Sequence, residues 1–285
     1  MKQTRKKPRI VEIWRQFRKN KLAVVALIVV ILLALLAIFA NVVAPYEYDE
    51  MFSKCANSSS SKEFLLGTDK LGRDILSRLI YGSRQSLAMG LVTVISASII
   101  GVIIGSIAGF YGGWVDNLLM RLLDIYQSVP MFLLCVTLAA ILGPSLRNAI
   151  IALAISMIPQ FARISRASVL TVREQEYVQA ARAVNCTNRY IIIRHIVPNI
   201  LAPIIVEITM GISSAILAGA SLSFIGVGVQ PPIPEWGAMI SDARNVMREY
   251  PTQALYPGLA IMLAVLAFNL MGDGLRDALD PRLKN

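Results

Sequence analysis

The chain has 285 residues, of which 55% are hydrophobic and only 16% are charged, and its mean hydropathy is +0.60. This balance lies outside the range of ordinary soluble domains and indicates a membrane protein. The formal net charge of +10 would suggest a nucleic-acid partner in a soluble chain. Here the positive charges flank apolar stretches, so we expect a lipid membrane and no nucleic acid.

The first element is a basic segment followed by an apolar stretch. Residues 1–21 contain nine Lys or Arg, and we predict a cytoplasmic segment with an amphipathic helix at residues 10–17. Residues 22–44 hold no ionisable side chain and can cross about 30 Å of hydrocarbon at about 1.5 Å per residue. The stretch also exceeds a signal-peptide core of about 7–15 residues. It therefore predicts a retained first transmembrane helix.

Five further apolar stretches follow an expected outer loop at residues 45–85. The stretches are 86–110, 125–142, 145–162, 200–222 and 255–272. Together with the first helix they predict an all-α protein with six transmembrane helices, in which residues 86–272 form a five-helix core. The second and third of these stretches are short for a span. Gly143 and Pro144 between them favour two helices joined by a tight turn, and one re-entrant hairpin is the alternative.

The distribution of positive charge predicts the orientation of these helices. If both termini are cytoplasmic, including a tail at residues 273–285, 19 of the 28 Lys and Arg residues lie inside. The positive-inside rule favours this topology. It also places a polar segment, residues 163–198, in the cytoplasm.

The sequence offers little for catalysis or cofactor binding. The chain has three widely spaced cysteines (Cys55, Cys135 and Cys186) and a single histidine, His195. No G-x-x-x-x-G-K-S/T nucleotide loop is present. We therefore expect no enzyme activity, no metal and no cofactor in this chain, and we interpret His195 as an exposed or contact residue.

The polar segment at residues 163–198 is predicted to be a docking platform. Tyr177, Ala181 and Val184 share one helical face, and Ala180 and Ala181 lack the bulk that would keep another surface away. Asn185 tolerates the left-handed conformation with which helices often end. A second short helix is expected at residues 187–196. The alternative is an ordinary cytoplasmic loop that is basic only because of membrane insertion.

The same segment resembles a known motif. QAARAVNCTNRYIIIRHIVP is similar to the EAA loop of ATP-binding-cassette (ABC) importer permeases, and Gln179, Ala180, Ala181, Asn185 and Pro198 occupy its Glu-Ala-Ala, Gly and Pro positions. Gln179, Asn185 and Val197 replace the family's Glu, Gly and Leu. GTDKLGRDILSRLIYGSRQSL, SLSFIGVGVQPPIPEWG and GDGLRDALDPRL resemble the second permease type of the peptide and nickel branch.

This resemblance implies a type I ABC importer permease in the bacterial inner membrane. Such a chain would be a transport subunit that catalyses no reaction of its own. Its partners would be a paralogous permease, two ATPases that bind ATP and Mg, and an external substrate-binding protein. The implied substrate is a di- or oligopeptide, with nickel or glutathione as alternatives. The residues implied to couple to the ATPase are Glu176, Tyr177, Gln179, Ala180, Ala181 and Asn185.

A different class of function is disfavoured by the predicted spans. An ion channel would need a pore-lining ring or filter, and an intramembrane protease would need paired aspartates or a Ser-His pair. Glu207 is the one ionisable residue in the 200–222 stretch. Intramembrane carboxylates usually face a cavity or a partner. We interpret Glu207 either as lining the passage, where it meets the amino end of a peptide, or as neutralising a basic residue of the partner permease or reaching interfacial water.

Three smaller patterns complete the expectations. Asp69, Arg73 and Asp74 would form a salt-bridged turn, or a surface for the external binding protein. Glycines at every fourth position would form a close helix-packing face; they are Gly101, Gly105 and Gly109. A proline-rich outer loop would carry Trp236 near the membrane interface; its prolines are Pro231, Pro232 and Pro234.

Overall fold

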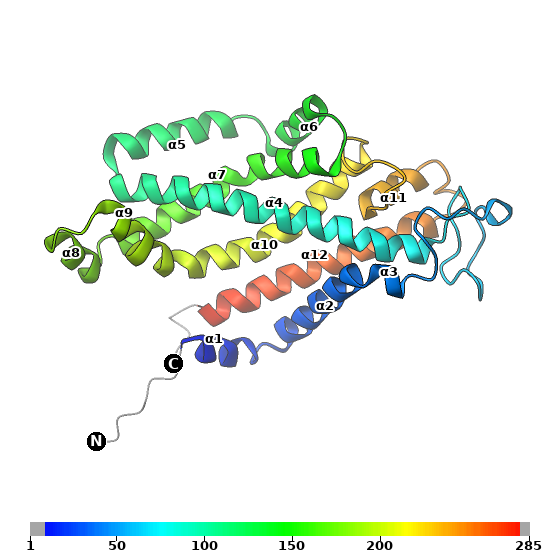
Figure 1. The fold of residues 1–285 in the computed structure, drawn as a ribbon, viewed down its shortest axis with the longest axis horizontal. Coiled ribbons are helices and arrows are strands. Elements are labelled where there is room, and N and C mark those ends of the chain that lie inside the picture. The colour runs from blue at the N-terminus through cyan, green and yellow to red at the C-terminus, as the bar shows by residue number, and fades with distance from the viewer. Residues whose placement is uncertain (1–8, 280–285) are drawn as a thin grey trace, which may run out of the picture.

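The computed structural model describes residues 9–279, which form helices and no strand. Five long helices run along the long axis of the molecule (Figure 1): α2 (Lys21–Ile38), α4 (Ile75–Tyr111), α7 (Leu146–Val172), α10 (Val197–Phe224) and α12 (Thr252–Leu279). Each is long and apolar enough to cross a membrane. The predicted all-α membrane class is confirmed.

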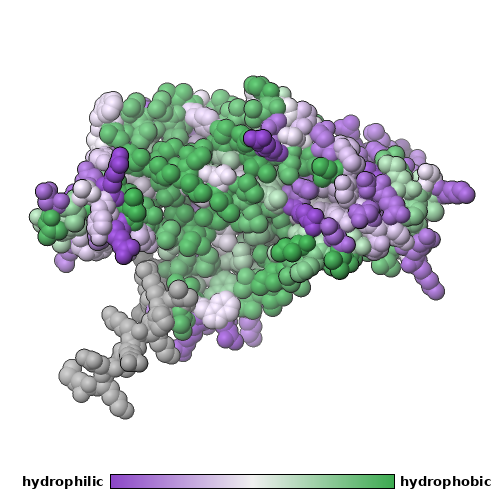
Figure 2. Space-filling model, in the orientation of Figure 1, coloured by the Kyte–Doolittle hydropathy of each residue, from purple (hydrophilic) through white to green (hydrophobic). Residues whose placement is uncertain are grey.

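The two ends of the bundle carry different elements. The short helix α8 (Glu176–Ala183) lies at one end, and α11 (Trp236–Ala243) lies at the other, near the segment between α3 (Ala40–Val43) and α4 (Figure 1). We call these the α8 end and the α11 end. Hydrophobic residues cover the middle of the molecule, whereas hydrophilic residues concentrate at both ends (Figure 2). A bilayer would therefore surround the middle.

The N-terminal helix α1 (Arg9–Phe17) confirms the helix expected at residues 10–17. It packs on the final turns of α12, because Phe17 and Ala23 form a small apolar cluster with Ala278. Residues 1–8 and 280–285 of the expected terminal segments lie outside the described residues.

Helix α4 begins earlier than expected. The side chain of Asp74 accepts a hydrogen bond from the Ser77 backbone N–H at 2.7 Å, so the helix starts at Ile75 and the loop predicted to reach residue 85 ends at Asp74. The first turns contain polar residues, which hid them from an apolar search. One of these, Arg84, donates from Nε to the Ala37 carbonyl oxygen at 3.0 Å and ties α4 to the end of α2.

The single helix predicted at residues 125–142 is wrong. Two helices, α5 (Gly113–Gln127) and α6 (Met131–Leu142), meet there at 80°. Pro130 explains the break, because proline disfavours a helical conformation in the preceding residue. Together the pair is long and apolar enough to be a sixth span. The following helix, α7, is long and apolar enough to cross alone, so a re-entrant arrangement would concern the α5–α6 pair and not both stretches.

The glycine face of α4 packs against α7 of the same chain. A Cβ at Gly101 would overlap Phe161, and one at Gly105 would overlap the Ala162 carbonyl oxygen. A Cβ at Gly109 would crowd Val169. The predicted close-packing role is confirmed, and α7 is its partner.

Replacing Gly105 by alanine should therefore force α4 and α7 apart. We expect a loss of about 1–3 kcal/mol, the usual cost of overpacking a close contact. Thermal unfolding of the detergent-solubilised protein measures it. Gly258→Ala is the matched control, because a Cβ at Gly258 in α12 would meet nothing within 4 Å. An equal loss of stability in both variants would contradict the packing role.

Candidate functional site

The helix α8 lies over an apolar cluster at the end of the bundle. Val178 and Ala181 point into an apolar cluster that includes Phe110 of α4 and Val169 of α7. The guanidinium of Arg182 lies over the Phe110 ring at 5.1 Å. These contacts make α8 a fixed part of the bundle end.

The C-terminal stop of α8 has the predicted geometry. Asn185 has a positive φ of 59°, which confirms the left-handed conformation expected there. The Cys186 N–H donates to the Ala181 carbonyl oxygen at 3.1 Å, and the Asn185 N–H donates to that of Arg182 at 2.9 Å. This pair of bonds is a Schellman motif. Asparagine thus performs at Asn185 the conformational role that glycine has in the resembling motif.

The second helix of the segment differs from the expected one. Helix α9 (Asn188–Tyr190) and the π-helical turn η2 (Ile191–Ile196) run without a break into α10. Pro198 in the first turn of α10 removes one backbone donor, and the wider π-helical turn lies directly before it. The segment is therefore an extension of a long helix and not a separate helix.

The exposed face of α8 carries most of the residues predicted to couple. Glu176, Gln179 and Ala180 are exposed, and Tyr177 is 41% exposed. Ala181 is only 7% exposed and packs inward, so it does not share an outer face with Tyr177 and Val184 as expected. Val178 and Ala181 are three residues apart and therefore share one face of α8. That face packs on the apolar cluster at the end of the bundle.

His195 belongs to an aromatic group beside this face. Its ring centroid lies 5.6 Å from that of Tyr190 and 6.4 Å from that of Tyr177. It is a contact residue, as the sequence predicted. Within residues 9–279, no three His, Cys, Asp or Glu side chains gather as a metal site would require.

A second candidate site lies at the bend between α5 and α6. A cavity of about 220 Å³ opens there, lined by Tyr126, Gln127, Val129, Met131, Leu134, Ser156 and Gln160. The side-chain amide of Gln160 also donates a hydrogen bond to the Glu207 carboxylate of α10. Amide, hydroxyl and aliphatic groups thus surround a cavity that has a carboxylate beside it. The sequence singled out Glu207 alone, because the bend that creates the cavity was not predicted.

Helix α5, which forms one wall of this cavity, is joined to α7 by two ion pairs. Arg166 Nη2 and Asp116 Oδ2 are 2.6 Å apart, and Arg163 Nη2 and Asp124 Oδ1 are 2.7 Å apart. Most of the other α5 side chains are exposed or half-buried. Charged contacts therefore hold this wall more than apolar packing does.

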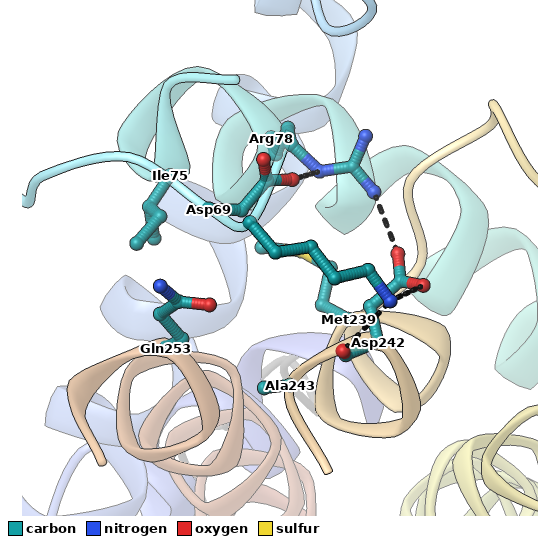
Figure 3. Close-up of a pocket in the computed structure, with 8 residues that line it drawn as sticks. Asp69, Ile75, Arg78, Met239, Asp242, Ala243 and Gln253 are labelled. Atoms are coloured by element: carbon teal, nitrogen blue, oxygen red, sulfur yellow. Dashed lines mark hydrogen bonds and ion pairs between the residues drawn. The ribbon is translucent and has the colours of Figure 1, made fainter. Parts of the chain in front are cut away.

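The α11 end contains an ion network, and Figure 3 shows its members Asp69, Arg78 and Asp242. Asp69 lies 2.7 Å from Arg73 Nε and 3.7 Å from Arg78 Nε. Asp242 of α11 lies 3.3 Å from Arg73 Nη2 and 3.6 Å from Arg78 Nη2, and Lys70 also pairs with it. Both guanidinium side chains are almost completely buried. We call these five residues the ion network.

Two expectations for the α11 end are wrong. Asp74 caps α4 and does not join the salt-bridged turn. Trp236 is 1% exposed, and its indole N–H donates to the Leu79 carbonyl oxygen at 3.1 Å, so it is a buried residue and not an interfacial one. Glu235 caps α11 and accepts a hydrogen bond from Ser86 Oγ at 3.0 Å. Residues distant in sequence create these contacts, and local patterns do not indicate them.

Comparisons with known proteins cover nearly the whole chain. The family model described as binding-protein-dependent transport system inner membrane component matches residues 101–285. The model described as the N-terminal TM domain of oligopeptide transport permease C matches residues 9–61.

Two curated relatives and one solved structure define these similarities further. The dipeptide transport system permease protein DppC of Alkalihalophilus pseudofirmus is 48% identical, and the match covers 96% of this chain and 90% of the relative. The glutathione transport system permease protein GsiD of Escherichia coli is 46% identical with the same coverage. The inward-facing MetNI methionine ABC transporter aligns with a TM-score of 0.60 at 18% identity, over 72% of this chain and 98% of the matched chain. This last likeness concerns the fold.

Proposed function

Because the chain belongs to the binding-protein-dependent transport system inner membrane components, we propose that it is the permease subunit of an ATP-driven importer for di- or oligopeptides. It is a multi-pass protein of the bacterial inner membrane. The observation that carries the substrate class is the near-full-length similarity to a dipeptide permease. Glutathione is the second candidate, because a glutathione permease is almost as similar.

The proposed complex contains a paralogous permease, two ATPases and an external substrate-binding protein. ATP and Mg would bind to the ATPases, because this chain has no nucleotide-binding loop. The α8 end and both termini would face the cytoplasm, and the α11 end would face outward.

The exposed face of α8 is proposed to dock on one ATPase. Glu176, Tyr177, Gln179 and Ala180 would form the contact, whereas Ala181 and Asn185 would hold the helix in place. Because α8 shares one apolar cluster with η2 and with the ends of α4, α7 and α10, a displacement of α8 would be passed to these helices. Closure of the ATPases around ATP would thereby alternate access to the path.

The cavity at the α5–α6 bend is proposed to lie on the substrate path. Its amide and hydroxyl groups match the hydrogen-bonding groups of a peptide backbone, and the Glu207 carboxylate would attract an α-ammonium group. Both peptides and glutathione carry such an ammonium group, so this chemistry is compatible with either substrate.

The proposed function is tested by uptake into proteoliposomes that contain the four membrane and ATPase components. The external binding protein is supplied with a dipeptide, an oligopeptide, glutathione or nickel. We expect ATP-dependent uptake of a peptide. Uptake of nickel alone would overturn the substrate class, and flux without ATP would overturn the importer mechanism in favour of a channel.

Glu207→Gln should reduce peptide uptake about tenfold, because it removes the charge that attracts the peptide ammonium while keeping the size of the side chain. Uptake of an N-acetylated peptide should change little, since that peptide lacks the ammonium. Ser214→Ala is the control, because Ser214 is a polar residue on the exposed face of the same helix. Equal losses for free and acetylated peptides would show that Glu207 has a structural role instead.

A further inference from the structure

A second cavity, distinct from the one at the α5–α6 bend, lies beside the N-terminal helix. It is an open groove with a volume of about 290 Å³, bordered by parts of α1, α2, α10 and α12. Its lining residues are Ile13, Trp14, Phe17, Leu27, Thr209, Met271 and Leu275. The Thr209 hydroxyl donates to the Ile205 carbonyl oxygen at 2.9 Å, so it offers no free donor to the cavity. The wall is therefore essentially hydrocarbon.

The chemistry of this wall restricts the occupant. An apolar wall favours an apolar occupant, because hydrocarbon surface buried against it is removed from water. A peptide segment would bring backbone N–H and C=O groups that this wall cannot satisfy. Trp14, at the rim, is 50% exposed and stacks on Phe17 with ring centroids 5.9 Å apart. Tryptophan side chains favour the depth at which lipid headgroups meet acyl chains.

The chain that follows the cavity-lining residue Trp14 is basic. Exposed cations follow and flank Trp14 on α1 and at the start of α2: Arg15, Arg18, Lys19 and Lys21. The acidic residues of the surroundings are Glu12 on α1 and Asp273 and Asp277 on α12, where Arg276 is a further cation. Over residues 1–21 the sequence has nine Lys or Arg and one Glu. Basic segments of this kind attract anionic lipid headgroups.

From these observations we propose that the cavity binds an acyl chain of one anionic phospholipid, whose phosphate is held by Arg15, Arg18 and Lys19. The lipid would come from the leaflet at the α8 end. The apolar wall favours a hydrocarbon chain, and the exposed cations of α1 and of the segment after it favour a negative headgroup. This inference requires that the α8 end lies at a membrane surface, and it does not depend on which substrate is transported.

The test is native mass spectrometry of the delipidated transporter complex, titrated with dioleoyl phosphatidylglycerol or with dioleoyl phosphatidylcholine. We expect one phosphatidylglycerol per chain to bind on the order of tenfold more tightly than phosphatidylcholine. Arg15→Gln combined with Arg18→Gln should remove this preference. Arg121→Gln combined with Arg189→Gln removes two exposed charges elsewhere and should keep it. Equal, unsaturated binding of both lipids would mean annular lipid only and would overturn the proposal.

A second pair of variants tests the cavity itself. Leu275→Trp fills the cavity and should abolish the tightly bound lipid, whereas Leu266→Trp places the same side chain on the exposed face of α12 and should not. If Leu275→Trp fails to assemble, the proposal is tested instead by quenching of tryptophan fluorescence in the native protein. Brominated phosphatidylglycerol should quench Trp14 fluorescence saturably at one lipid per chain, and Trp14→Phe should remove that signal. Linear quenching without saturation would overturn the proposal.

Discussion

Replacing Ala180 by arginine should abolish ATP-driven uptake while leaving the permease folded. Ala180 lies on the exposed face of α8, where a long side chain can extend into solvent but would separate α8 from a docked ATPase. A central interface position of this kind commonly changes binding by 2 kcal/mol or more, so we expect uptake to fall on the order of 30-fold or more. Proteoliposome uptake and co-purification of the ATPase measure the effect.

Two neighbouring substitutions separate docking from folding. Ala180→Ser keeps a small side chain and should transport normally. Ala181→Leu adds bulk to the buried cluster under α8 and should lower the thermal stability by about 1–3 kcal/mol, which Ala180→Arg should not do. Full uptake by Ala180→Arg would show that this face does not contact the ATPase.

Replacing Asp69 by asparagine should strongly destabilise the α11 end. The side chains of Arg73 and Arg78 are 2% and 3% exposed, and both face Asp69. Removing one partner from a buried ion pair costs about 3–5 kcal/mol, because a charge is left without compensation. With a shift of about 2–4 °C per kcal/mol, the Tm should fall by roughly 10 °C.

Asp242→Asn provides the graded comparison for this prediction. Asp242 is 28% exposed, and its contacts with the two guanidinium groups are longer. Water can therefore compensate part of the loss, and we expect a cost nearer 1 kcal/mol. A larger effect from Asp242→Asn than from Asp69→Asn would contradict the assignment of Asp69 as the centre of the ion network.

The sequence predicted those features that depend on local patterns. Apolar length identified the long helices, the four-residue glycine spacing identified the packing face of α4, and Asn185 identified the stop of α8. Each of these is determined by the backbone preference or the side-chain volume of residues close in sequence. Polar helical turns escape such a search, which is why the start of α4 at Ile75 was missed.

The remainder depended on contacts between distant residues. Arg73 and Asp242 are 169 positions apart, so no local pattern indicates that they meet. The inward direction of Ala181 depends on the position of the cluster under α8. The cavity beside Glu207 exists only because α5 and α6 meet at a sharp angle near Gln160. The sequence could therefore suggest Glu207 but not its surroundings.

The length of α4 sets the height of the ion network relative to the bilayer. At about 1.5 Å per residue its 37 residues extend about 55 Å, whereas the hydrocarbon layer measures about 30 Å. Because the first turns of α4 are polar, much of the length by which α4 exceeds the hydrocarbon layer lies at the α11 end. Arg73, just before α4, and Arg78, in its first turn, would therefore lie outside the acyl-chain region. In a thicker or thinner bilayer, α4 would change its tilt. The contacts of the ion network would then remain in the headgroup region or beyond it.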